Sequence, residues 1–113
     1  MAVSNDFLDY ILDQFSAWGQ VTARKMFGGA GLYREGKMFA LIADNVAYLK
    51  VDATNKDKFE AAGSSPFKPY PNKPTVMSYY EIPPEILEAP EELIAWAEES
   101  LAIQKKLKPA LKK

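Results

Sequence analysis

The chain has 113 residues, 48% of them hydrophobic, with 14 Lys and Arg against 15 Asp and Glu and a net charge of −1. It contains no cysteine and no histidine. This composition excludes disulfides, thiolate-ligated metal sites, cysteine nucleophiles and Ser-His-Asp triads. The charge balance argues against non-specific nucleic-acid binding, which needs many cations facing phosphates. Without histidine, cysteine or a catalytic motif, we expect no enzyme activity, no metal and no cofactor. With no cysteine, no basic leader at residues 1–5 and no apolar run of roughly 18–20 residues, we expect a cytoplasmic domain with no membrane-spanning segment.

The first half of the chain predicts one helix followed by a strand meander. Asn5 or Asp6 can cap the helix, and Gly19 ends it. Short strands are expected at residues 22–27, 32–33, 38–43 and 46–51, joined by turns at 34–37 and 44–45. Connections this short make neighbouring strands antiparallel. The apolar stripe of the helix comprises Phe7, Leu8, Ile11, Leu12 and Phe15.

The second half predicts two further helical regions around a last strand. Asp52 or Thr54 can cap a short helix that Gly63 closes, before a proline-rich loop at residues 64–74. A fifth strand is expected at residues 76–82. A short helical piece at residues 85–87 and a long helix from Pro90 follow. One face of the long helix holds Leu93, Trp96, Ala97, Leu101 and Gln104.

This order predicts an α+β fold, a two-layer antiparallel sheet with flanking helices in the order α-β(3-4)-α-β(1-2)-α. A single domain is expected over residues 1–104, and a flexible lysine-rich tail over 105–113. Residues 38–43 are apolar on both faces of their strand, which favours burial on both sides. A second subunit packed on the open face of the sheet is one way to achieve that burial.

Arg24 and Lys25 precede a cluster of glycines that begins with Gly28 and Gly29. Cations beside backbone N–H groups suit an anion or a phosphate, so these four residues are candidates for binding an anion or a partner. The segment is not a P-loop, because it lacks the final Gly-Lys-Ser/Thr and no helix follows it. The alternative interpretation is a strand with a glycine-driven bend or bulge before a hairpin.

Aromatic residues in and after the proline-rich loop are candidates for binding a partner. Phe67 and Tyr70 lie among two Pro-x-x-Pro spacings, which an extended-peptide receptor could recognise. The alternative is that both rings cover one end of the sheet. Tyr79 and Tyr80 point to opposite faces of a strand, so one could lie in the core and the other be exposed for stacking or a subunit contact. The favoured alternative is that both are ordinary aromatic residues of the strand.

The charges of the C-terminal region are segregated. Glu91 and Glu92 begin the long helix and five lysines lie within residues 104–113. This distribution complements the helix macrodipole, which favours acids at the N-terminus and cations at the C-terminus. The lysines could also form an electrostatic arm for nucleic acid.

Several segments together resemble the TfoX/Sxy N-terminal domain family. The opening signature lies at residues 24–33, and residues 38–44 with 47–50 are similar to the central hairpin of the family. The later strand of the family resembles Phe67 with Tyr70, followed by residues 77–83. The closing helix of the family resembles the segment that ends in Trp96 and Ala97. The resemblance spans about residues 23–100, nearly the whole expected domain.

The resemblance implies a fold similar to that of secretion chaperones, which commonly form homodimers. The founding members of the family are bacterial, cytoplasmic regulators of natural competence. They act with a cyclic-AMP-responsive transcription factor to switch on DNA-uptake genes. Those regulators carry a second, helical domain, so this sequence is expected to be a stand-alone N-terminal domain. No catalytic residue is carried over from the family. The resemblance thus favours a non-enzymatic regulatory or protein-interaction domain with a transcription-factor partner.

Two alternative functions remain open from the residues themselves. The first is direct nucleic-acid binding through Arg24, Lys25 and the lysine tail. The second is binding of a small anion or nucleotide at the turn of residues 28–31.

Overall fold

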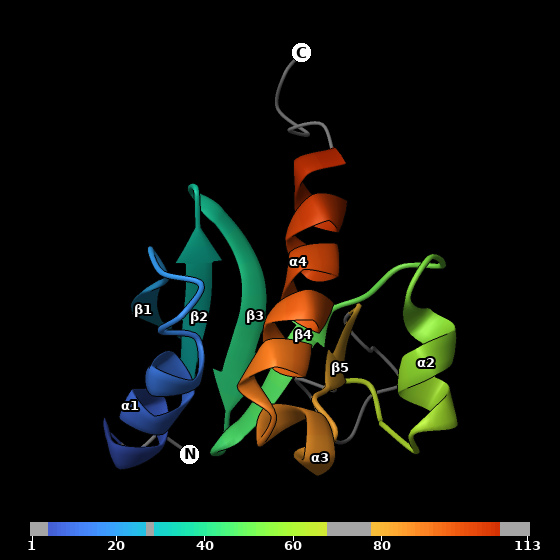
Figure 1. Cartoon of the computed structure of the whole chain (residues 1–113), viewed down its shortest axis with the longest axis horizontal. Helices are drawn as coiled ribbons and strands as arrows, with labels where there is room; N and C mark the ends of the chain where they lie inside the picture. The colour runs from blue at the N-terminus through green and yellow to red at the C-terminus, as the bar shows by residue number, and fades with distance from the viewer. Residues whose placement is uncertain (1–4, 27–28, 68–77, 107–113) are drawn as a thin grey trace.

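The computed structural model describes residues 5–26, 29–67 and 78–106. Phe27, Gly28, Tyr70, the start of the expected fifth strand and most of the expected tail lie outside the described residues. The elements, labelled in Figure 1, are α1 (Asn5–Gln14), β1 (Thr22–Met26), β2 (Gly29–Arg34), β3 (Lys37–Ala43), β4 (Val46–Lys50), α2 (Lys56–Ala61), β5 (Tyr79–Glu81), α3 (Pro84–Leu87) and α4 (Pro90–Lys106).

The five strands form one antiparallel sheet in the order β1-β2-β3-β4-β5, so every strand pairs with its neighbour in sequence. The two tightest connections are two-residue turns. Glu35 and Gly36 both have positive φ (55° and 77°), as do Asp44 and Asn45 (53° and 59°). Two consecutive positive φ angles are typical of type I′ hairpin turns, whose twist matches that of the strands. The predicted meander and α+β class are confirmed.

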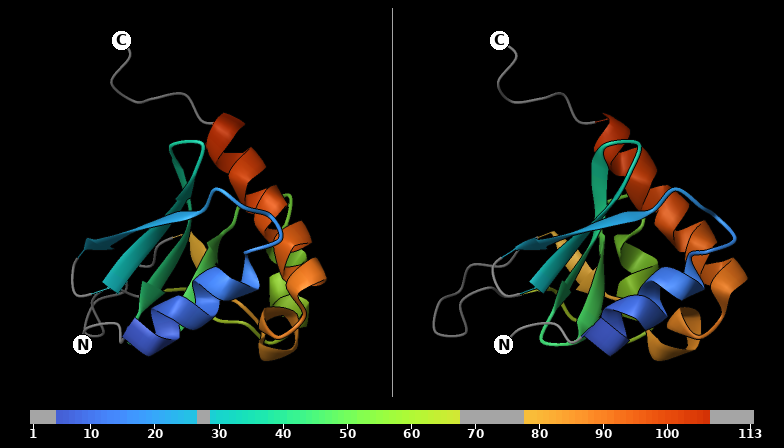
Figure 2. Two further views of the ribbon diagram at one scale, coloured as in Figure 1. Left: turned by 60° about the vertical axis from the view of Figure 1, so that its left-hand side comes forward. Right: turned by 90° about the vertical axis from the view of Figure 1, so that its left-hand side faces the viewer.

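The four helices pack on one face of the sheet, and the other face bears no helix in the described part of the chain (Figure 2). The core lies between the two layers. Its largest fully buried apolar side chains are Ile11 of α1, Phe15 of the segment after α1, Phe59 of α2, Leu93 of α4, and Leu32, Phe39, Ile42 and Leu49 of the sheet. Burial of these side chains supplies the main favourable term in folding.

A bulge in β3 explains how that strand is buried on both faces. Leu32 pairs with Ala40 and Tyr33 pairs with Met38, so Phe39 is an extra residue in the ladder. Its ring turns into the helical layer, where it packs edge-on against Phe15 at 5.4 Å. On the helix-free face, Leu41 is only 7% exposed in the single chain. The predicted burial of this strand is confirmed, and it does not require a second subunit.

Two helix boundaries differ from the sequence-based expectation. Helix α1 ends at Gln14, before Gly19, because the next turn is tight: Phe15 and Ser16 donate to the carbonyls of Leu12 and Asp13, three residues back. Gly19 then takes a positive φ of 79°, which reverses the chain toward β1.

The expected N-cap of α2 was wrong, whereas Gly63 follows the last helical turn with a positive φ of 81° as predicted. The N-cap is Asn55, whose side chain does not cap the helix. Instead the buried Asn55 amide accepts from the Asp52 N–H (2.9 Å) and donates to the Lys50 carbonyl (3.2 Å). The Asp52 carboxylate accepts from the N–H of Thr54 at 2.8 Å, which makes a local turn before the helix.

Helix α4 begins at Pro90 as predicted, and it contributes two buried residues that the sequence did not single out. Ser100 is fully buried and its hydroxyl donates to the Lys50 carbonyl at 2.7 Å, while Ile103 is 3% exposed. Lys105 and Lys106, assigned from the sequence to the tail, lie in the last turn of the helix. Among the described residues, no helix is both long and apolar enough to cross a bilayer.

Candidate functional site

The two predicted cations of the glycine-rich segment lie on β1, at one edge of the sheet. Arg24 and Lys25 are both exposed, and they face opposite sides because successive strand residues alternate. Arg24 lies opposite Gly31 on the helix-free side, with its guanidinium over the Tyr33 ring at 5.4 Å. The strand therefore presents one cation on each side of its exposed edge.

Gly29 has a packing role in the structure. It is buried in β2, opposite Met26 of β1, and a Cβ placed on it would lie 2.1 Å from the carbonyl oxygen of Ile42. Only glycine lets β2 approach the β3 backbone so closely. This contact supports the interpretation of the segment as a strand. Because Gly28 lies outside the described residues, the anion site at residues 28–31 remains a prediction.

Phe67 extends the opposite edge of the sheet. Its N–H donates to the Tyr79 carbonyl at 2.8 Å, and the Glu81 N–H donates to the Ser65 carbonyl at 3.0 Å. The Phe67 ring packs on Tyr48 with ring centroids 5.0 Å apart. Residues 65–67 thus cover β5, in agreement with the alternative that this ring closes one end of the sheet. Tyr70, predicted to act with Phe67, lies outside the described residues.

Neither tyrosine of β5 is exposed, contrary to the first of the two interpretations. Tyr80 is half-buried on the helical side, with its ring centroid 6.1 Å from that of Phe59. Tyr79 is 4% exposed; its hydroxyl donates to the Met38 carbonyl (3.4 Å) and accepts from the Gln104 amide (3.3 Å). Burial raises the pKa of Tyr79 to about 12. Both rings therefore join β5 to helices.

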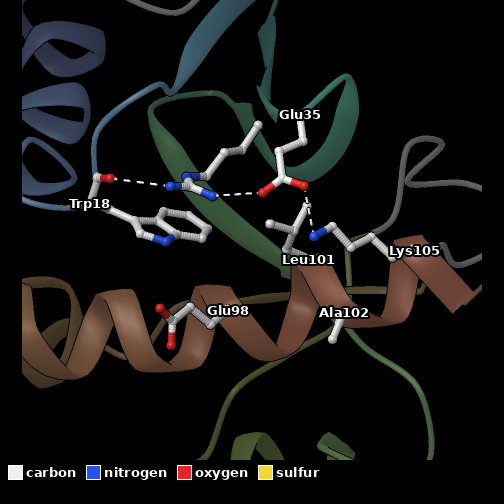
Figure 3. A pocket seen from close by; sticks show the side chains of 7 residues that line it. Trp18, Glu35, Glu98, Leu101, Ala102 and Lys105 are labelled. Carbon is white, nitrogen blue, oxygen red and sulfur yellow. Dashed lines mark hydrogen bonds and ion pairs between the residues drawn. The ribbon is translucent and has the colours of Figure 1, made fainter.

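The structure also assembles a pocket that the sequence did not reveal, where the β2–β3 turn meets the second half of α4 (Figure 3). Its volume is about 230 Å³. The Arg34 guanidinium lies 4.5 Å from the Trp18 ring centroid and donates to the carbonyls of Gly19 (3.1 Å) and Trp18 (3.3 Å). Arg34 thereby fixes the chain between α1 and β1 to the hairpin.

Carboxylates balance the cations of this pocket. Glu35 contacts Arg34 at 3.0 Å and Lys105 at 2.7 Å, and Glu98 lines the pocket from α4 (Figure 3). The hydrogen bond from Lys105, and then its charge and that of Arg34, lower the pKa of Glu35. Two cations facing two carboxylates do not favour an anionic ligand. The arrangement is best suited to holding the hairpin and α4 together.

Two lysines considered for the nucleic-acid arm are already paired with acids. Lys105 contacts Glu35, and Lys106 lies 3.8 Å from the Asp52 carboxylate. Hydrogen bonds from Thr54, together with the charge of Lys106, lower the pKa of Asp52. These pairs reduce the positive charge that the end of α4 can offer to phosphates. Residues 107–113, which hold the other three lysines, lie outside the described part of the chain.

Ser64 and Ser65 lie in the segment after α2, and a serine hydroxyl is a potential nucleophile. The Ser64 hydroxyl donates to the Glu81 carbonyl. Ser65 and Lys68 have the Ser-x-x-Lys spacing of one class of serine nucleophiles, and the Ser65 carbonyl accepts from the Glu81 N–H. Lys68 lies outside the described residues. Within the described ranges, no group of three acidic, histidine or cysteine side chains could hold a metal ion.

Comparison with known proteins agrees with the resemblance drawn from the sequence. The sequence model of the TfoX N-terminal domain matches residues 13–103, from the end of α1 to the last turns of α4. A protein of Aliivibrio fischeri named DNA transformation protein TfoX1 is 29% identical over 85 residues, covering 74% of this chain and 40% of that protein. The chain thus spans about two fifths of the length of this relative. Because the match covers most of the chain and includes every strand of the sheet, the chain belongs to the TfoX N-terminal domain family.

Proposed function

We propose that this domain is a non-catalytic, cytoplasmic regulator of DNA transformation that works by binding a protein of the transcription machinery. The family match over residues 13–103 is the observation that carries the proposal. It is supported by the name of a relative, a DNA transformation protein, which aligns with most of this chain.

The structure supports a binding role through the surfaces that its two layers leave available. All four helices occupy one face of the sheet, and in the described part of the chain no strand pairs with the outer edge of β1, which leaves that edge for a partner (Figure 2).

Asn55 and Ser100 are buried polar residues of the described chain, and both side chains donate to the backbone carbonyl of Lys50. These hydrogen bonds join elements of the fold to one another.

Direct nucleic-acid binding is less well supported than protein binding. Arg24 lies over Tyr33, while Lys105 and Lys106 contact carboxylates. Binding to phosphates gains most of its free energy from many unneutralised cations. The exposed cations of β1 are too few to supply that term by themselves.

Deletion of the gene in its source organism tests this function. We expect a fall in transformation frequency and in the transcripts of DNA-uptake genes, both restored by the wild-type gene. A domain with Lys56→Glu, a change at an exposed helical residue, is expected to restore both as well. Unchanged transcripts together with normal transformation in the deletion strain would contradict the proposal.

The homodimer remains a separate proposal that rests on the likeness to secretion chaperones. The near-complete burial of Leu41 within one chain removes the packing argument for it. Sedimentation equilibrium over a range of concentrations tests the dimer. A mass of 12.6 kDa at every concentration would exclude it.

A further inference from the structure

The two edges of the sheet differ in whether backbone groups are paired. At the β5 edge, residues 65–67 pair with Tyr79 and Glu81 through two backbone hydrogen bonds. At the β1 edge, the described residues contribute no strand beyond β1 itself (Figure 1). Every second residue of an edge strand directs its N–H and C=O outward. β1 is therefore the edge at which an extended peptide could add a strand.

The side chains of β1 determine which kind of peptide fits. Thr22, Arg24 and Lys25 are exposed, and β1 carries no acidic residue. The two cations flank the edge on opposite sides of the sheet, so two adjacent acidic residues of an added strand would meet one cation each. An incoming strand with basic residues at these places would be repelled. The edge is thus complementary to an acidic extended segment.

We propose that the β1 edge binds an acidic, extended segment of another protein by β-strand addition, and that this segment belongs to the partner assigned under the proposed function. Main-chain hydrogen bonds to β1 give the affinity, and the two cations select acidic segments. The proposal deepens the proposed function, on which it rests, by naming the surface and the chemistry of the partner.

No segment of this chain itself provides the complementary strand. Residues 1–4, 27–28, 68–77 and 107–113, whose structure is not described, contain no Asp or Glu. The strand residue with an acidic side chain is Glu81, whose backbone N–H is already bonded to the Ser65 carbonyl. Within residues 1–113, therefore, no strand is available to supply the acidic segment, and the proposal assigns that segment to a partner.

A second copy of the chain is also a poor occupant of this edge. Antiparallel pairing of β1 with its own copy, centred on the strand, would place Arg24 directly opposite Arg24 of that copy. Like charges directly opposite each other destabilise a strand pair. Nucleic acid could contact the cations, but it has no peptide groups with which to continue the sheet.

The test uses a labelled, end-capped peptide, Thr-Val-Glu-Glu-Val-Thr, whose adjacent glutamates face opposite sides when it is extended. Binding to the full chain is followed by fluorescence anisotropy, and the site is mapped by amide chemical shifts. We expect shifts concentrated in β1 and β2. Two further peptides act as controls: one with both glutamates replaced by lysine, and one N-methylated at every second residue, which cannot pair its main chain.

Charge reversal on the protein makes the test specific. The variant with Arg24→Glu and Lys25→Glu is expected to bind the glutamate peptide about tenfold more weakly and to gain affinity for the lysine peptide. Lys56→Glu, a reversal of the same sign on α2, should leave both affinities unchanged. If the reversed variant does not fold, the double variant Arg24→Gln and Lys25→Gln takes its place. The readout is then only the weaker binding of the glutamate peptide, because glutamine adds no negative charge to attract the lysine peptide.

Four results would overturn the proposal. Two concern the glutamate peptide alone: no binding at about millimolar concentration, or amide chemical-shift changes that lie away from β1. The third is binding of the N-methylated peptide with the same affinity as the glutamate peptide. The fourth is displacement of the glutamate peptide from β1 by a DNA oligonucleotide at about 50 mM salt, where phosphate contacts are strong. The deletion strain separates this failure from failure of the proposed function. If the reversed variant restores transformation as well as the wild type does, the function stands and the β1 site is wrong.

Discussion

The carboxylate of Glu35 and the ammonium of Lys105 lie 2.7 Å apart and join the β2–β3 turn to the last turn of α4. Glu35 also contacts Arg34, which is bonded to the carbonyls of Trp18 and Gly19. One chain of polar contacts therefore connects the segment after α1, the hairpin and the C-terminal helix (Figure 3). It holds together three elements that lie far apart in the sequence.

Lys105→Met should raise the pKa of Glu35 toward its ordinary value, because the hydrogen bond from Lys105 is the largest cause of its lowering. A carboxyl whose pKa is lowered by folding stabilises the native state above its unfolded pKa, and that contribution is lost as the pH falls through the folded pKa. The variant should therefore lose less stability on acidification than the wild type. The drop in Tm at neutral pH should be small, since both groups are exposed.

Carboxyl chemical shifts followed over a pH titration measure this change. Lys106→Met is the matched control, because Lys106 contacts Asp52 instead and should leave the titration of Glu35 unchanged. An unaltered pKa of Glu35 in the Lys105 variant would show that the ion pair does not persist in solution.

The carbonyl of Lys50 accepts from two buried side chains, Ser100 at 2.7 Å and Asn55 at 3.2 Å. Ser100→Ala should lower the free energy of unfolding by about 1 kcal/mol, the typical value of one such hydrogen bond. Combining it with Asn55→Ala removes both side-chain donors, so the double variant should lose more than the sum of the two, by at least about 0.5 kcal/mol.

Urea denaturation of the four proteins in this cycle gives the coupling energy. Ser16→Ala, at an exposed serine after α1, should change stability by less than about 0.5 kcal/mol. Simple additivity of the two core substitutions would mean that another donor replaces the lost ones.

Gly29→Ala and Gly36→Ala separate two reasons for requiring glycine. At Gly29 the added Cβ would lie 2.1 Å from the Ile42 carbonyl oxygen, a clash with backbone that no rotamer relieves. At Gly36 no atom lies within 4 Å, and only the φ of 77° opposes a side chain. We expect a cost of about 1–2 kcal/mol at Gly36 and a larger one, on the order of 3 kcal/mol or loss of folding, at Gly29.

Thermal and urea unfolding of both glycine variants measure these costs. The shift of the backbone needed at Gly29 should also perturb the amide resonances of β3, whereas Gly36→Ala should affect the turn alone. Equal costs at the two positions would show that β2 and β3 can move apart without penalty.

Tyr79 should make stability fall at alkaline pH. Burial raises its pKa to about 12, above the ordinary value of 10.0. Tyrosine is neutral when protonated, so its contribution is fully present below the unfolded pKa and is lost as the pH rises from 10 toward 12. Tyr79→Phe should reduce this loss of stability at alkaline pH. At neutral pH the variant should be less stable than the wild type, because it lacks the hydrogen bond to the Met38 carbonyl.

Ultraviolet titration of the tyrosines, with unfolding measured at several pH values, checks the effect of Tyr79. Tyr10→Phe is the control, because Tyr10 is 40% exposed and its loss should leave the alkaline stability unchanged. If Tyr79→Phe and the wild type lose stability in parallel above pH 10, the hydroxyl of Tyr79 is not buried in solution.

Local chemistry explains why much of the fold was predictable. Gly36, Asp44 and Asn45 are residue types that tolerate positive φ, so the hairpins could be located from sequence. The apolar periodicity of α1 and Pro90 at the start of α4 placed those helices. The N-cap of α2 was misassigned because Asn55 bonds to Asp52 and Lys50, which lie before the helix, and no rule of residue spacing predicts those partners.

The sequence by itself determined the α+β class, the antiparallel meander, the basic pair Arg24 and Lys25, and the family. These follow from contacts between neighbours along the chain and from short signatures. The tertiary structure decided that Gly29 packs against Ile42, that Leu41 is buried without a second subunit, and that Glu35 meets Lys105. It also decided that β1 is the edge left unpaired in the described part of the chain, because residues 65–67 cover the other edge. Such relationships join residues far apart in sequence, and their geometry depends on how the strands twist and the helices pack.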